Sequence, residues 1–201
     1  MQSIDDKIIL SIKKCGRGKV FFTSDFVRYG ESKSANKALE RLVKSNEIIR
    51  IARGIYYYPK IDKKLGLGIL YPSLETIAEA IAKRDKAKII PAGAYALNRI
   101  GLSTQVPMNI VYQTDGSPRK IKIGNGKGIR FIRTAPKNLA YKNELILLIV
   151  LALKEITEGK VTDEQRAHIK KLLTNEPKER IMQDSQLMPS WIRSIIMKCY
   201  E

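Results

Sequence analysis

The chain has 201 residues and a formal net charge of +17, from 37 Lys and Arg against 20 Asp and Glu. Because 44% of its residues are hydrophobic, it can bury the core of one or two domains, which excludes a chain that is disordered throughout. Its two cysteines lie at opposite ends of the sequence, which excludes a disulfide scaffold. The acidic start does not resemble a signal peptide, and the apolar runs are too short to span a membrane, so we expect a cytoplasmic protein.

Residues 1–60 show the element order of a winged helix-turn-helix. Isoleucines at helical spacing follow Ser3, and the glycines at positions 16 and 18 end this first helix. A short β-prone run leads to a second helix, which we expect Thr23 or Ser24 to cap. The third helix carries an apolar stripe over residues 35–43, and two strands joined at Arg53 and Gly54 form the wing.

Beyond this domain we expect a linker, residues 61–71, and a second domain, residues 72–201. Helical and strand patterns alternate in it, and turn signals separate three consecutive strands that would form a small antiparallel sheet. The fold class is therefore α+β: an N-terminal winged helix-turn-helix followed by a mixed α+β domain with C-terminal helices. The expected elements are helices from residue 72 and from residue 94, strands 88–90, 108–114, 119–123 and 128–134, helices 143–158 and 163–173, and shorter helices around residues 181 and 191.

The sequence offers little for catalysis. His168 is its only histidine and follows Arg166 in a basic helical segment, where an exposed side chain is the simplest interpretation. A Cys/His metal site is excluded by composition, and the glycine-rich run at 124–128 lies between two strands, not before a phosphate-binding helix. We therefore predict no enzyme activity, no catalytic residue, no metal and no cofactor.

The positive charge is unevenly distributed. It is +7 over residues 1–60, +9 over 61–140 and only +1 over 141–201, so a polyanion would meet the first two thirds of the chain. The start of the third helix and the wing have the side chains that read bases and hold phosphates in helix-turn-helix proteins. The candidate DNA-binding residues there are Ser32, Lys33, Ser34, Asn36, Lys37, Arg41, Arg50 and Arg53, with Tyr57 beside the wing arginines.

A second basic segment lies in the expected sheet. Residues 119–133 hold six Lys or Arg and no acid, but side chains alternate between the two faces of a strand, so only some of them can meet one partner. Lys120, Lys122 and Arg130 share one face by this alternation, and we expect them to contact phosphates that flank the site of the winged helix.

Two stretches resemble a known family. The first comprises Gly18-x-Val20-Phe21, Asp25-Phe26, Ala38-Leu39-x-Arg41-Leu42, Ile49-Arg50 and Arg53-Gly54-Ile55-Tyr56; the second runs from Pro91-x-Gly93-x-Tyr95 to Thr114-Asp115-Gly116. Together they are similar to the AbiEi-type antitoxins of bacterial abortive-infection toxin–antitoxin systems. The resemblance implies a DNA-binding domain that represses its own operon, a second domain required for antitoxicity, and a nucleotidyltransferase-like toxin that is countered without stable binding.

From these patterns we expect a DNA-binding transcriptional regulator of the antitoxin type, whose partners are double-stranded operator DNA, arranged as inverted repeats, and functionally a toxin. Two alternatives remain open. The chain is a protein-sequestering antitoxin if its basic surface meets a toxin, and an RNA-binding protein if that surface meets an RNA duplex by shape.

Overall fold

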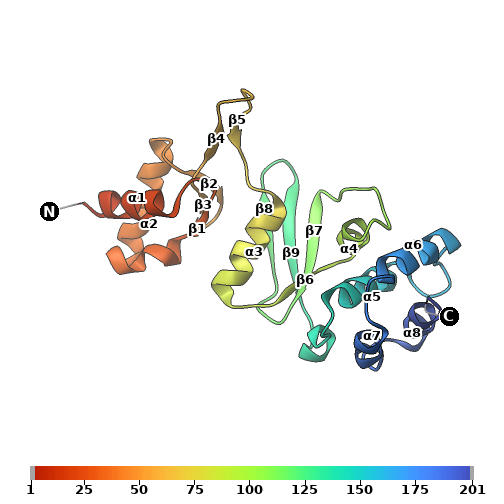
Figure 1. Cartoon of the computed structure of the whole chain (residues 1–201). Helices are drawn as coiled ribbons and strands as arrows, with labels where there is room; N and C mark the ends of the chain where they lie inside the picture. Colours follow the sequence, from red (N-terminus) through yellow and green to blue (C-terminus); the bar gives the residue numbers. More distant parts are fainter. Residues whose placement is uncertain (1–2, 200–201) are drawn as a thin grey trace. The chain divides into compact units, whose positions relative to one another are not determined.

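The computed structural model describes residues 3–199, and these fold into two compact units (Figure 1). The first unit runs through Arg84 and includes Lys122–Asn125, and the second comprises Asp85–Ile121 and the residues from Gly126 on. The elements in chain order are α1 (Ile4–Cys15), β1 (Val20–Phe22), the 3₁₀ helix η1 (Thr23–Tyr29), α2 (Ser32–Lys44), β2 (Ile49–Ala52), β3 (Ile55–Tyr57), β4 (Lys60–Asp62), β5 (Gly68–Leu70), α3 (Leu74–Asp85), β6 (Ile89–Ala92), α4 (Ala94–Arg99), β7 (Asn109–Thr114), β8 (Arg119–Ile123), β9 (Lys127–Arg133), η2 (Pro136–Leu139), α5 (Glu144–Ile156), α6 (Asp163–Leu173), α7 (Lys178–Ser185) and α8 (Ser190–Lys198).

The first unit is a winged helix, as the sequence predicts. Ser3 and Asp6 form a reciprocal capping box that starts α1, and the buried residues Ile8 and Ile12 of α1 pack with those of α2 in one core. The three strands pair in the order β1-β3-β2, all antiparallel. The helix between β1 and α2 is a 3₁₀ helix. Its cap position is Phe22 and no side chain caps it, so the expected cap by Thr23 or Ser24 is wrong; the Asp25 carboxylate accepts the Phe22 N–H at 2.9 Å.

The chain expected to be a linker contains structure of its own. Residues 60–62 and 68–70 pair as an antiparallel hairpin, β4–β5, which Figure 1 shows as an arm projecting beyond the winged-helix sheet. The two compact units divide after Arg84, which places α3 with the winged helix. The Arg84 guanidinium at the end of α3 lies 4.3 Å from the centroid of the Phe22 ring, a cation–π contact within the first unit.

The second unit combines a four-stranded sheet with helices. Its strand order is β6-β7-β9-β8, with β6 and β7 antiparallel but β7 and β9 parallel, so the sheet is mixed where a wholly antiparallel one was expected. The reason is that β8 does not lie beside β7, the strand that precedes it, but pairs at the edge with β9. The side chains Ile110, Tyr112, Ile129 and Phe131 are consequently brought together on one buried face.

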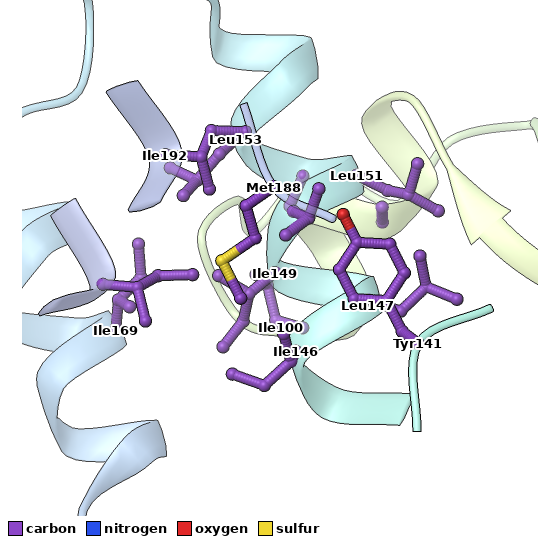
Figure 2. Packing of buried hydrophobic residues seen from close by; sticks show 14 of the residues in the cluster. Ile100, Tyr141, Ile146, Leu147, Ile149, Leu151, Leu153, Ile169, Met188 and Ile192 are labelled. Atoms are coloured by element: carbon purple, nitrogen blue, oxygen red, sulfur yellow. The ribbon is translucent and has the colours of Figure 1, made fainter. Parts of the chain in front are cut away.

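The core of the second unit surrounds α5, which is apolar on almost every side. Leu147, Ile149 and Leu153 are fully or almost fully buried, and residues of α6 and α8 pack against them, as Figure 2 shows for Ile169 and Ile192. Asn143 caps the start of α5, because its side chain accepts the Ile146 N–H. A helix buried all round is what its continuous apolar sequence predicts.

The α7 helix is fastened to the start of α5 by a buried carboxylate. Asp184 is only 2% exposed and accepts hydrogen bonds from the backbone N–H groups of Lys142 at 3.0 Å and Asn143 at 2.9 Å. The neighbouring Tyr141 donates its hydroxyl proton to the Leu187 carbonyl. Burial, and then the charge of Asp184, raise the pKa of Tyr141 to about 12.

Candidate functional site

Helix α2 turns an apolar face inward and a polar face outward. Its buried residues Ala35, Ala38, Leu39 and Leu42 lie on one stripe, as the spacing predicts. Lys33, Asn36, Lys37, Glu40 and Lys44 are exposed away from that stripe.

The turn into α2 is set by a close approach between backbone and side chain. A Cβ on Gly30 would lie 3.0 Å from the Cδ1 atom of Ile4, so a larger residue there would require the Ile4 side chain to shift. Ser34 is half-buried beside the same turn, with its Cβ 3.8 Å from that Gly30 position. Ser34 therefore lies on the α1 side of the helix, apart from the other residues of its predicted group.

An open polar recess of about 570 Å³ lies between α2 and the wing. One wall is a row of side chains one turn apart on α2, Ser32, Asn36 and Glu40, and the other wall holds the two wing arginines, Arg50 and Arg53. The remaining lining residues are Thr23, Gly54 and Tyr56. The structure thus brings together four predicted site residues: Ser32, Asn36, Arg50 and Arg53.

The wing tip is hydrogen-bonded to the start of η1. Gly54 has a φ of +72°, a conformation that favours glycine, and its carbonyl accepts the Thr23 N–H at 3.3 Å. The register of β2 against β3 shifts between Arg50 and Ala52, so a bulge precedes the tip. These features present Arg53 to solvent at the end of the hairpin.

Two predicted residues lie elsewhere. Arg41 forms a bidentate ion pair with Asp5 of α1, with both N–O distances at 2.6 Å, and this hydrogen bonding lowers the pKa of Asp5. Tyr57 is buried, and its hydroxyl donates to the Leu70 carbonyl at 2.6 Å, so Tyr56 lines the recess in its place. Helical spacing from Asn36 would have identified Glu40, whereas nothing in the sequence points to Tyr56.

The basic strands of the second unit show the predicted alternation. The guanidinium of Arg119 lies 5.3 Å from the ring centroid of Phe131, and Arg119 also pairs with Asp85. Lys120 and Lys122 alternate with Arg119 along β8, and Arg130 alternates with Phe131 along β9; all three are exposed. They share the face opposite the Arg119–Phe131 contact, as expected, and Lys120 and Arg130 line one shallow recess of about 560 Å³.

His168 is half-buried, not exposed as the sequence suggested. Its Nε2 atom lies 2.7 Å from the Ile100 carbonyl oxygen, and a Cβ on the neighbouring Gly101 would come within 3.1 Å of that nitrogen. This packing gives the only histidine of the chain a structural role between α4 and α6. Between residues 3 and 199, no group of three or more His, Cys, Asp or Glu side chains is placed to hold a metal ion.

Over the same described residues, no helix is long and apolar enough to cross a membrane. No curated protein matches the chain. Among solved structures, the crystal structure of the RV2827C protein from Mycobacterium tuberculosis is similar to it, with a TM-score of 0.48, 13% sequence identity, and coverage of 97% of this chain and 81% of that one. A family model matches residues 7–181, and the chain therefore belongs to DUF6088, a family of unknown function.

Proposed function

We propose that this protein is a sequence-specific double-stranded DNA-binding regulator. The observation that carries the proposal is the recess in which the polar row of α2 meets the two wing arginines. In this arrangement α2 lies in the major groove with its N-terminal residues toward base edges, and the wing reaches the adjacent backbone or minor groove. Lys33 and Lys37 are exposed beside the row, so positive charge flanks it on the outward side.

The side chains of the recess suit base recognition. Asn36 offers a donor and an acceptor, which together match the N6 and N7 atoms of adenine. Glu40 is an acceptor that suits the N4 amino group of cytosine, and Arg53 at the wing tip suits phosphate or a narrow minor groove. The recess therefore combines groups that read sequence with groups that hold the backbone, which a purely charge-based interface does not need.

Strands β8 and β9 add phosphate contacts in this proposal. Lys120, Lys122 and Arg130 lie on one exposed strand face and have no carboxylate partner among residues 3–199. Such contacts strengthen binding and make it salt-dependent without reading sequence. The similarity to AbiEi-type antitoxins extends the proposal to a protein that represses its own toxin–antitoxin operon in the cytoplasm and counters a nucleotidyltransferase-like toxin.

The test is selection of duplexes from a randomised library by the full chain, followed by affinity measurements on the selected and a scrambled duplex. Asn36→Ala should weaken binding to the selected duplex by about 1–3 kcal/mol and change binding to the scrambled one little. Asn175→Ala, at an exposed asparagine in the loop after α6, is the matched control and should change neither. Failure to enrich any sequence would refute the proposal.

A salt titration tests the contacts of β8 and β9 separately. Each neutralised phosphate contributes about 0.9 to the slope of log affinity against log salt, so replacing Lys120, Lys122 and Arg130 with Ala should flatten the slope by about two to three units. The preference for the selected duplex should persist. The control replaces Lys154, Lys160 and Lys178, which are exposed in the charge-balanced C-terminal segment, and should leave the slope unchanged.

A further inference from the structure

The β4–β5 hairpin concentrates exposed apolar side chains. Five of the twelve large apolar residues that the described chain exposes lie between residues 61 and 71. Their exposed fractions reach 77% at Leu65 and 63% at Leu67, both in the loop between the strands, and the others are Ile61, Ile69 and Tyr71. Scattered single exposures need no explanation, but a cluster on one short arm marks an interaction surface.

The hairpin is nevertheless held by specific hydrogen bonds at both of its ends. Ile61 and Ile69 face each other across the two strands, and the Tyr57 hydroxyl ties the hairpin base to β3 through the Leu70 carbonyl. Arg17 donates to the Pro59 carbonyl at 2.8 Å, just before β4 begins. At the other end, the Asp62 carboxylate accepts the Leu65 N–H at 2.8 Å and orders the loop.

The charge of the hairpin indicates what it meets. Lys60, Lys63 and Lys64 are exposed and have no carboxylate partner within residues 3–199, and the single acid nearby, Asp62, already accepts the loop N–H. A second copy of the chain would bring these lysines against one another. A polyanion instead complements them, and a two-stranded ribbon with a leucine-bearing tip fits a DNA groove.

The hairpin is also within reach of the DNA that the winged helix would hold. Lys60 follows Gly54 of the wing tip by six residues, and six residues of extended chain span at most about 20 Å. One helical turn of DNA measures about 34 Å. The base of the hairpin and the wing tip therefore lie within one turn of the duplex.

We propose that the β4–β5 hairpin is a second DNA-contacting element, in which Lys63 and Lys64 hold phosphates while Leu65 and Leu67 wedge against base steps in a minor groove and bend the duplex. This inference rests on the proposed function, because it places the hairpin beside a duplex already held by α2. Apolar wedges of this kind kink DNA by roughly 20–90°.

The experiment uses the full chain and the duplex that it selects, with donor and acceptor dyes at the two duplex ends to report bending. Lys63→Ala with Lys64→Ala should flatten the salt slope by about 1.8. Leu65→Ser with Leu67→Ser should weaken binding by about tenfold and reduce the bend while leaving the slope unchanged. The matched controls are Lys154→Ala with Lys178→Ala, and Val106→Ser with Met182→Ser at exposed apolar positions; they should match the wild-type chain.

The outcomes separate the two proposals. If the wild-type chain selects no duplex, the proposed function fails and this inference fails with it. If the wild-type chain binds and bends its duplex but both hairpin variants behave as the controls do, only the hairpin inference is overturned. It is also overturned if the leucine variant loses self-association in sedimentation, or loses binding to anionic lipid vesicles, with DNA binding intact. Thermal unfolding checks that the variants are folded. We expect them to fold, because the changed residues are exposed to solvent.

Discussion

Glu40 provides a sharp test of how the recess works, because it is an acid in a surface proposed to meet a polyanion. Glu40→Gln removes the charge while nearly conserving size and helix propensity. A carboxylate about 8 Å from a phosphate is repelled by about 0.5 kcal/mol in water, so the change should tighten binding to a scrambled duplex about two- to threefold at low salt. On the selected duplex, the Gln amide oxygen can still accept from cytosine N4, but the hydrogen bond loses its charge assistance, and this loss of about 1–1.5 kcal/mol should outweigh the gain.

The predicted result is therefore a change of opposite sign on the two duplexes. The assay is fluorescence anisotropy on both duplexes at two salt concentrations, and the ratio of their affinities is the quantity of interest. Glu179→Gln, at an exposed position in α7, is the control for removal of one acid from a distant part of the chain. Equal tightening on both duplexes would show that Glu40 only repels phosphate, and that the row on α2 does not read sequence at this position.

Three further predictions concern ion pairs and buried polar groups. Arg41→Ala should lower the free energy of unfolding at neutral pH, but not at a pH below the range in which Asp5 titrates. The same variant should leave the salt slope of DNA binding unchanged, whereas Lys37→Ala should flatten that slope by about 0.9. Asp184→Ala should cost about 2–4 kcal/mol in urea denaturation, because two partly buried backbone N–H groups lose their buried acceptor. Since the pKa of Tyr141 rises to about 12 on folding, wild-type stability should fall relative to Tyr141→Phe between pH 10 and 12, while the difference stays constant below pH 10.

Elements with a strong period were predictable from sequence. The spacing of apolar residues on α2 and the continuous apolar run of α5 predict which residues are buried, and the structure confirms both helices, α5 within two residues of its expected bounds 143–158. The wing was also predictable, because a positive φ at its tip requires a residue such as Gly54 between two β-prone runs. In each case the signal is local, so a single sequence is enough to detect it.

Strand partnership was not predictable, because it depends on contacts distant in sequence. Consecutive strands joined by turns usually pair, yet β8 lies at the edge and leaves β7 beside β9 in parallel.

The β4–β5 hairpin was missed for a different reason. Its strands have three residues each, too few to show alternation, and its loop glycines and lysines are also typical of a linker.

The same distinction explains which site residues could be predicted. Alternation within an element correctly grouped Ser32 with Asn36 on α2, and Lys120 with Lys122 on β8. The same spacing could not show that Arg41 pairs with Asp5, because Asp5 lies 36 residues away on another helix. Ion pairing leaves the net charge of the chain unchanged, but it decides which cations remain available to a polyanion. On α2 these are the lysines, which have no carboxylate partner among residues 3–199, and their flexible ammonium groups suit phosphates better than bidentate base recognition. In the proposed complex, Asn36, Glu40 and the wing arginines are therefore the residues that we expect to read sequence. Changes at these positions should alter the preferred duplex, whereas changes at the lysines should alter only affinity and its salt dependence.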